Sequence, residues 1–244
     1  MFDFIVTTVG GLIESIVAAF ERVFIVDGRY QLWLEGLQNT LIIAFFALII
    51  GLVLGFSLAV VRVSHDAAIK PNIFLRLLNR IIKIYITIIR GTPMMVQLLI
   101  FNFIILAASR NQVLIAIIAF GINSSAYASE IFRGGILSVD KGQAEAGRSL
   151  GLNYAQTMFK VILPQAVKNS LPALGNEFIT VLKETALAGQ VAVRDVTRVA
   201  NNIRGLTYDP TPLLFVAAIY LILVLLLEFL VGRLERRLRR SDQR

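Results

Sequence analysis

Polar and ionisable side chains interrupt several strongly apolar stretches of this sequence. Asn123, Ser124 and Glu130 share one such stretch, and Glu177 follows a proline in another. A carboxylate inside a membrane costs roughly 3 kcal/mol or more unless it meets water, a partner or a ligand, so such groups mark solute pathways. The sequence therefore predicts that these residues bind a polar or cationic solute.

Catalysis by this chain is not expected. The sequence has no cysteine and one histidine, His65, which leaves no disulfide, no thiol nucleophile and too few ligands for a metal site. It contains no GxxxxGKS/T phosphate loop, no GxSxG turn and no HExxH helix. We expect a protein that is not an enzyme, that binds no metal or cofactor itself, and that borrows any energy source from a partner.

The composition is that of an integral membrane protein. Of 244 residues, 57% are hydrophobic and only 16% are charged, and the mean hydropathy is +0.74. Because a membrane helix needs about 20 mainly apolar residues, the pattern predicts an all-α protein with about five transmembrane helices. The expected spans are residues 36–61, 84–108, 112–132, 163–182 and 213–231.

Two spans carry residues that affect helix packing. Gly51 and Gly55 in the first span have the GxxxG spacing that permits close helix contact, and they fit a two-fold assembly with a second chain. The second span is interrupted by Arg-Gly-Thr-Pro at residues 90–93. Proline cannot continue a helix without losing a hydrogen bond, so we expect a kink or break there.

The basic residues indicate the orientation of the chain. They cluster after the first, third and fifth spans, and with five crossings these clusters fall on one side, which the positive-inside rule makes cytoplasmic. The N-terminus is then outside and the C-terminus inside. The net charge of +8 is thus explained by basic residues that flank the membrane spans, and we expect no nucleic-acid binding. The predicted divisions are an amphipathic N-terminal segment (1–30), a transmembrane domain (31–232) and a basic cytoplasmic tail (233–244).

Residues 138–164 form a soluble-looking cytoplasmic segment between two apolar spans. We expect one helix at residues 138–150, with Asp140 near its start and Gly151 in a left-handed turn beyond its end. A second helix, at residues 154–161, is expected to be closed by Pro164. Two short helices joined at a glycine make a compact protrusion, which on the residues alone is also consistent with a plain helical loop.

This segment resembles the signature of ATP-binding-cassette importer permeases, which is Glu-Ala-Ala, three residues, Gly, nine residues, Ile, one residue and Leu-Pro. The matching residues are Glu145, Ala146, Gly151, Leu163 and Pro164, while Gly147 replaces the second Ala and Val161 replaces Ile. The resemblance implies a type I importer permease fold. It also implies that these residues belong to a coupling-helix loop that docks in a groove of a separate ATPase subunit, which holds ATP and Mg²⁺.

Three further stretches look like the polar amino-acid permeases, the histidine, arginine and glutamine uptake group. They are RGTPMMVQ at residues 90–97, SAYASEIFRGGI at residues 125–136 and GNEFITVLKETAL at residues 175–187. The resemblance implies a permease subunit in the bacterial cytoplasmic membrane. It implies as partners ATPase subunits, a second permease chain, identical or related, and an extracytoplasmic amino-acid-binding protein.

An amino-acid substrate needs acceptors for its ammonium group and donors for its carboxylate. The expected substrate-binding residues are Glu177, Asn176, Thr180, Asn123, Ser124, Tyr127, Glu130, Thr92 and Gln97. Glu177 is the strongest candidate acceptor, and backbone N–H groups at the kink near Thr92 are candidate donors. Several acidic groups near the path favour a cationic side chain, as in arginine, lysine or histidine.

Other roles remain open for several of these residues. Glu130 and Arg90 can pair with each other, and Tyr127 can belong to the core. Asn123, Ser124 and Ser125 can satisfy one another by helix-to-helix hydrogen bonds. Residues 184–209 are expected outside, either as a membrane-surface helix or, as the resemblance implies, as a surface that receives the binding protein.

The alternative function belongs to another class of membrane protein. In a self-sufficient ion channel or secondary transporter, Glu130 and Glu177 would relay ions. Inverted internal repeats would favour that alternative, and the sequence shows no convincing one.

Overall fold

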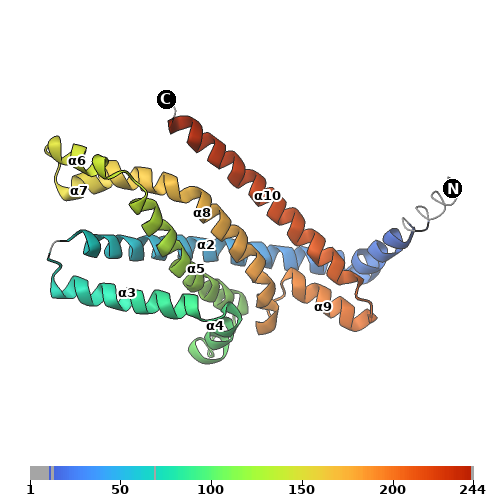
Figure 1. The fold of residues 1–244 in the computed structure, drawn as a ribbon. Helices are drawn as coiled ribbons and strands as arrows, with labels where there is room; N and C mark the ends of the chain where they lie inside the picture. Colours follow the sequence, from blue (N-terminus) through green and yellow to red (C-terminus); the bar gives the residue numbers. More distant parts are fainter. Residues whose placement is uncertain (1–10, 12–13, 69, 243–244) are drawn as a thin grey trace.

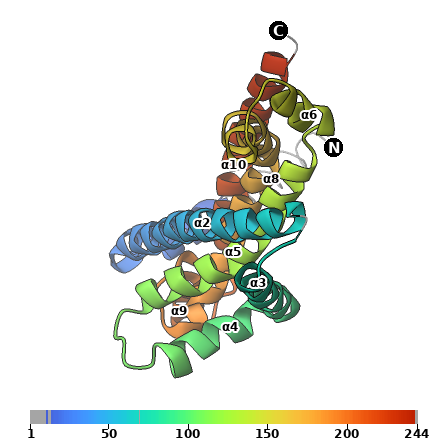
Figure 2. The same ribbon diagram turned by 90° about the vertical axis from the view of Figure 1, so that its left-hand side faces the viewer.

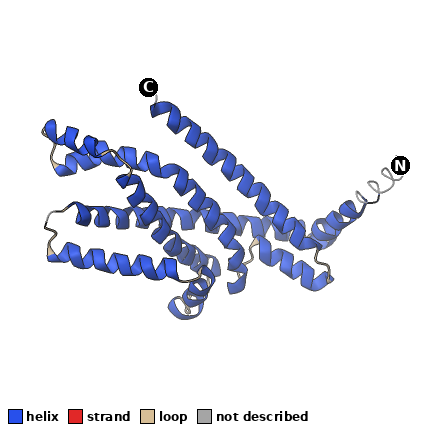
Figure 3. Cartoon of the chain, in the orientation of Figure 1, coloured by secondary structure: helices blue, strands red, loops and turns tan. Residues whose placement is uncertain are grey.

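The computed structural model describes residue 11, residues 14–68 and residues 70–242, with side chains described as far as residue 238. Throughout this part every regular element is helical (Figure 3), which confirms the predicted all-α class. The long helices are α2 (Tyr30–Ala67), α3 (Ile73–Gly91), α5 (Gln112–Leu137), α8 (Leu163–Glu184) and α10 (Thr211–Asp242). The shorter elements are η1 (Glu21–Ile25), η2 (Val26–Gly28), α4 (Met94–Ile100), η3 (Phe101–Ile105), α6 (Lys141–Ser149), α7 (Tyr154–Thr157), η4 (Met158–Ile162), η5 (Thr185–Val191) and α9 (Val196–Thr207).

Four of the five predicted spans lie inside single helices, which are α2, α5, α8 and α10. By length and apolar composition, α2, α5 and α10 can each cross a membrane, and α3 with α4 and η3 makes a fourth crossing if the bent pair is one span. The helix α8 is not among them, since polar residues such as Asn176 and Glu177 lower its mean hydropathy. The predicted count of five is therefore not reached on length and composition alone.

The predicted start of the second span, residue 84, is wrong. Helix α3 begins at Ile73, where Asn72 Oδ1 accepts a hydrogen bond from the Leu75 N–H at 2.8 Å. Arg76, Arg80 and Lys83 follow one another at three or four positions in α3 and lower its mean hydropathy, although the helix keeps an apolar face. The first half of α3 therefore contains no long uninterrupted apolar run that would identify it as part of a span.

The predicted break in the second span is confirmed. Helix α3 ends at Gly91, and the chain bends by 109° into Met94–Ile105. Pro93 supplies no N–H for a continued helix and disfavours the helical conformation at Thr92, which is extended with φ −119° and ψ 144°.

Helix α5 lies at the centre of the fold and packs against α2, α3, α4 and α8. Figures 1 and 2 both show it crossing α2. A Cβ atom built on Gly51 would lie 2.7 Å from Ser124 Oγ, and one built on Gly55 would lie 2.6 Å from Ala128 Cβ. The predicted close contact at these glycines is confirmed, but it joins two helices of one chain. It therefore gives no support for a two-fold assembly.

The apolar face of α9 packs on the protein. Val196, Val199 and Ile203 are each at most 2% exposed and form a core cluster with Trp33 of α2. Figure 1 shows α9 beside the first turns of α2, at the end of the molecule opposite α6 and α7. The interpretation of this segment as a membrane-surface helix is therefore wrong, because its apolar face is already covered.

Part of the predicted N-terminal amphipathic segment, residues 1–10 and 12–13, lies outside the described residues. Its described end packs on the protein, since Val23 is 1% exposed. The Val23 carbonyl accepts a hydrogen bond from Trp33 Nε1 at 3.1 Å.

Candidate substrate pathway and coupling helices

Three consecutive polar residues of α5 form hydrogen bonds with three different helices. Asn123 Nδ2 donates to Gln97 Oε1 of α4 at 3.0 Å, and Ser124 Oγ donates to Glu177 Oε1 of α8 at 2.8 Å. Ser125 Oγ lies 2.6 Å from a tyrosine hydroxyl of α3. The predicted helix-to-helix hydrogen bonds are present, but they join each residue to another helix and not the three to one another, because successive helix positions point about 100° apart.

Glu177 is half-buried on the side of α8 that faces α5. Asn176 and Thr180 lie on an exposed part of α8, where Thr180 Oγ1 donates to the Asn176 carbonyl at 3.1 Å. The structure thus joins Glu177 to Ser124 and leaves the other two residues outside that pair. A carboxylate can accept about four hydrogen bonds, so the bond from Ser124 leaves acceptor capacity for a ligand.

Gln97 braces the break between α3 and α4. Its Nε2 donates to the Ile89 carbonyl at 2.7 Å, to Thr92 Oγ1 at 2.7 Å and to the Thr92 carbonyl at 3.1 Å. A broken helix leaves carbonyls without helical partners, and this side-chain amide supplies one. Gln97, Thr92 and Asn123 therefore come together, as a structural brace. That backbone N–H groups at the kink bind a carboxylate stays a prediction.

Glu130 is held by two arginines, and Arg90 is not one of them. Its Oε1 accepts a hydrogen bond from Arg62, and its Oε2 lies 2.9 Å from Arg133 Nη2. Arg90 lies instead over the Tyr127 ring, 5.3 Å from the centroid, within the range of a cation–π interaction. The expected pairing of Glu130 with Arg90 is wrong, and Glu130 is a neutralised carboxylate.

Sequence reasoning missed Arg62, which lies 68 residues before its partner Glu130. Arg62 and Glu130 each lie at the end of an apolar stretch, and the two stretches end on the same side of the membrane. Their similar depth in the membrane was the sequence signal that could have predicted the ion pair. Tyr85, the partner of Ser125 in α3, was missed as well. Tyr85 lies inside the predicted second span, but its hydroxyl gave no sign in the sequence of the partner on α5.

The first short helix, α6 (Lys141–Ser149), begins three residues later than the predicted residue 138, but the predicted features at its two ends are confirmed. Asp140 Oδ1 accepts a hydrogen bond from a backbone N–H of the first turn at 2.6 Å, and Gly151 has a φ of +77°. That φ is one that glycine adopts without strain. Gly147 is buried, and a Cβ there would lie 2.7 Å from Thr157 Cγ2. The missing side chain at Gly147 lets the two short helices touch.

The second coupling helix does not end at Pro164. Elements α7, η4 and α8 follow one another without interruption, and Pro164 lies in the first turn of α8, where its missing N–H costs little. Leu163 is 7% exposed and packs against Ile136 of α5. Glu145 and Ala146 are exposed on α6. Among the signature residues, Leu163 is thus buried against α5, whereas Glu145 and Ala146 belong to the exposed surface of α6.

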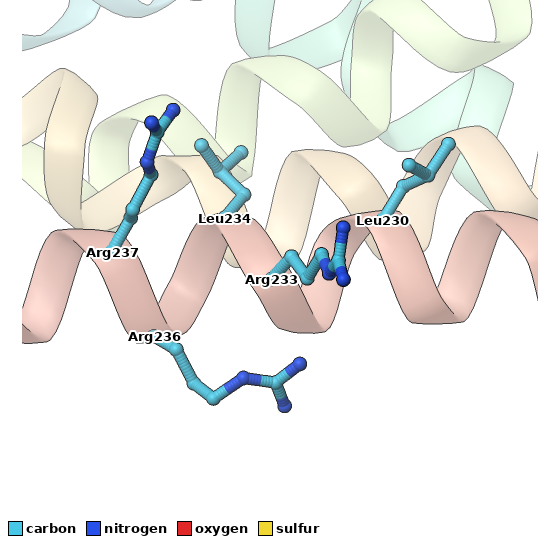
Figure 4. Close-up of a pocket in the computed structure, with 5 residues that line it drawn as sticks. All are labelled: Leu230, Arg233, Leu234, Arg236 and Arg237. Carbon is cyan, nitrogen blue, oxygen red and sulfur yellow. The ribbon is translucent and has the colours of Figure 1, made fainter.

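A hollow of about 590 Å³ beside α10 is lined by Arg233, Arg236 and Arg237 (Figure 4). The figure shows Arg236 and Arg237 pointing to opposite sides of the helix, and Arg233 lies over the Phe229 ring, 4.5 Å from its centroid. The three guanidinium groups do not converge on one point, so this hollow lacks the geometry of an anion site. We interpret these residues as the basic flank of the last span.

Comparisons with known proteins bear on this arrangement of helices. A family model described as the binding-protein-dependent transport system inner membrane component matches residues 51–240. The chain belongs to this family. The bent α3–α4 pair, α5 and the α6–α7 protrusion all lie within the matched residues.

Similar proteins include two permeases of Bacillus subtilis (strain 168). The arginine transport system permease protein ArtQ is 40% identical over 213 residues, which cover 86% of this chain and 93% of that protein. The L-cystine transport system permease protein TcyB is 38% identical over 209 residues, which cover 84% of this chain and 86% of that protein. A putative glutamine transport system permease protein of Rickettsia typhi is 37% identical over 209 residues, covering 84% and 92% of the two chains.

Solved structures agree with this assignment. An amino acid ABC transporter crystallised with histidines matches with a TM-score of 0.76 and 40% identity, over 85% of this chain and 94% of that one. The inward-facing MetNI methionine ABC transporter, 22% identical, shares the fold with a TM-score of 0.76. The predicted importer-permease fold and the resemblance to the polar amino-acid permeases are confirmed.

This chain is the multi-pass membrane permease subunit of an ABC-type amino-acid importer, and it is not the catalytic subunit of that importer. Membership in the family implies ATPase subunits, a binding protein and a second permease chain as partners. The alternative of a self-sufficient channel or secondary transporter is set aside, because the family supplies one component of a multi-subunit system.

Proposed function

We propose that this permease imports polar amino acids and prefers those with a cationic side chain, such as arginine, lysine and histidine. The observation that carries the proposal is the Ser124–Glu177 pair between α5 and α8. Glu177 is half-buried and receives a bond from a neutral hydroxyl, whereas Glu130 is neutralised by two arginines. A carboxylate with acceptor capacity at membrane depth favours an ammonium or guanidinium group.

The named relatives support the class of substrate more strongly than its identity, since they include permeases for arginine, cystine and glutamine. In our proposal Asn176 and Thr180, on the exposed side of α8, line the path in the assembled importer, and Asn123, Gln97 and Thr92 shape it as a brace. The test is uptake of radiolabelled arginine, lysine, histidine and glutamine by the reconstituted importer with its binding protein. Faster uptake of glutamine than of the three cationic amino acids would contradict the preference.

The exposed side chains of the coupling helices support docking to a separate ATPase that holds ATP and Mg²⁺. Leu150 is 80% exposed, Phe159 is 64% exposed and Tyr154 is 55% exposed. Figure 1 shows α6 and α7 as a protrusion at one end of the molecule. Apolar side chains that gather on an exposed protrusion mark a protein interface, so we assign this surface to the ATPase.

Replacing Gly151 with phenylalanine should uncouple the importer. The backbone φ of +77° is strained for a bulky L-residue by about 1–2 kcal/mol, so the turn between α6 and α7 should shift. We expect uptake to fall at least about tenfold, with the permease still inserted in the membrane, when uptake and ATP hydrolysis are measured together. Gly151→Asn is the matched control, since asparagine tolerates this conformation. Normal uptake by the Gly151→Phe importer would rule out the coupling role.

The proposed topology places the N-terminus outside and the C-terminus inside. A reporter fused after Arg244 should be active in the cytoplasm, and a reporter placed before Phe4 should be active outside. Protease accessibility in sealed vesicles gives an independent measurement. Both ends on one side would mean an even number of crossings, and α8, whose apolar character is weakest, would then be the helix that fails to cross.

A further inference from the structure

A second polar pocket lies along α5, closer to the coupling helices than Glu177. This basic pocket has a volume of about 310 Å³ and is lined by Arg62, Lys83, Ile86, Thr87, Arg90 and Glu130. Three cations therefore surround one carboxylate, which Arg133 also pairs. The volume falls at the lower end of the range typical of small-ligand pockets.

One donor of the pocket lacks a partner. Arg62 is 9% exposed, and its Nε is buried without a hydrogen-bond acceptor among the described residues. A buried N–H of a charged group left unpaired costs about 1–3 kcal/mol or more. Arginine presents its N–H groups in a fork that fits carboxylate and phosphate oxygens. The guanidinium group of Arg62, beside Lys83 and Arg90, thus suits an anionic oxygen ligand.

The pocket continues a polar line on α5. Asn123, Tyr127 and Glu130 are spaced as neighbours on one helix face, and they contact Gln97, Arg90 and Arg62 in turn. Glu130 lies six positions beyond Ser124, the residue that bonds Glu177, which is roughly 9 Å along the helix axis. Six positions also turn the helix by about 240°, so the pocket and the Ser124–Glu177 pair are separated both along and around α5.

The two flanks of α3 differ in chemistry. A groove on the other flank is lined by Leu54, Leu58, Ile81 and further apolar residues, which suits lipid chains. The basic pocket contains Ile86 as its one apolar side chain. This contrast favours a solute over a lipid as the occupant of the basic pocket.

We propose that the basic pocket binds the carboxylate of the amino acid after it leaves Glu177 on its way toward the end of α5 that carries the coupling helices. This inference rests on the proposed function. Lys83, Arg90 and the guanidinium group of Arg62 supply the donors. Glu130 competes with the incoming carboxylate for Arg62, so the pocket holds the substrate weakly, as an exit site requires.

Chemical labelling of Lys83 tests this pocket directly. The assembled importer in nanodiscs of neutral phosphatidylcholine is acylated at lysines, and labelling of each lysine is followed by mass spectrometry. Excess arginine should slow labelling of Lys83 at least about threefold, whereas agmatine, the same molecule without its carboxylate, should not. Lys70, exposed and outside the pocket, is the internal control and should label equally in all samples.

Two variants separate the pocket from general effects. Arg90→Gln should abolish the protection of Lys83 by arginine, and Arg80→Gln, on the exposed side of α3 but outside the pocket, should retain it. Equal protection by arginine and agmatine, or none by either, would overturn the proposal. Protection that depends on added phosphatidylglycerol and not on arginine would also overturn it, because the occupant would then be a lipid phosphate.

Uptake by the same purified importer, reconstituted in sealed vesicles, distinguishes failure of the pocket from failure of the proposed function. Wild-type importer that takes up arginine without protecting Lys83 would overturn the pocket alone. Importer that takes up no polar amino acid would overturn the proposed function and the pocket with it.

Discussion

Replacing Glu177 with glutamine in the assembled importer should lower uptake of arginine and lysine by about 10- to 100-fold, the cost of one charge-assisted hydrogen bond. Glutamine keeps the size of the side chain and an oxygen that can accept from Ser124 Oγ, now 2.8 Å from the carboxylate. The substitution therefore removes the charge and keeps the contact between α5 and α8. Initial uptake rates over a range of concentrations measure the effect.

The pattern across substrates identifies which part of the amino acid Glu177 contacts. If Glu177→Gln removes the preference for arginine over glutamine, Glu177 contacts the cationic side chain of the substrate. If it weakens uptake of both amino acids equally, Glu177 contacts the α-ammonium group. Glu228→Gln is the matched control, because Glu228 lies in membrane helix α10 on an exposed position. A lower thermal stability with unchanged apparent affinities would remove Glu177 from the substrate site.

Replacing Gly55 with alanine should destabilise the permease by about 1–3 kcal/mol through overpacking, a fall in Tm of about 3–10 °C. The new Cβ would lie 2.6 Å from Ala128 Cβ, 2.9 Å from the Ser125 carbonyl oxygen and 2.9 Å from the Ser129 nitrogen. Backbone atoms cannot move aside as a side-chain end can, so α2 and α5 must separate. Thermal unfolding of the purified permease in one detergent measures the change.

Gly205→Ala is the control variant, for which we expect no loss of stability. Gly205 lies in α9, and a Cβ there would meet no heavy atom within 4 Å. Alanine is favoured over glycine in a helix by up to about 1 kcal/mol, so this variant should be unchanged or slightly more stable. If Gly55→Ala were as stable as Gly205→Ala, the close contact of α2 with α5 would not be a stabilising feature of the fold.

The elements and signature of this protein could largely be predicted from local properties of the chain. An apolar length near the thickness of a membrane identifies α2, α5 and α10, whatever they pack against. Pro93 predicts the break because its missing N–H acts within one turn, and Gly151 predicts a left-handed turn for the same kind of local reason. The permease signature in the coupling segment is likewise a matter of residues and spacing.

The tertiary structure decided which polar groups are free to bind a solute. Ser124 bonds Glu177, and Glu130 bonds Arg62, because the faces of α5, α8 and α2 meet at a particular rotation and depth. It also decided that Val196 and Val199 of α9 are covered by protein instead of facing lipid. Hydrogen bonds and burial depend on neighbours that are distant in sequence, whereas membrane length, helix breaks and turns depend on a few adjacent residues.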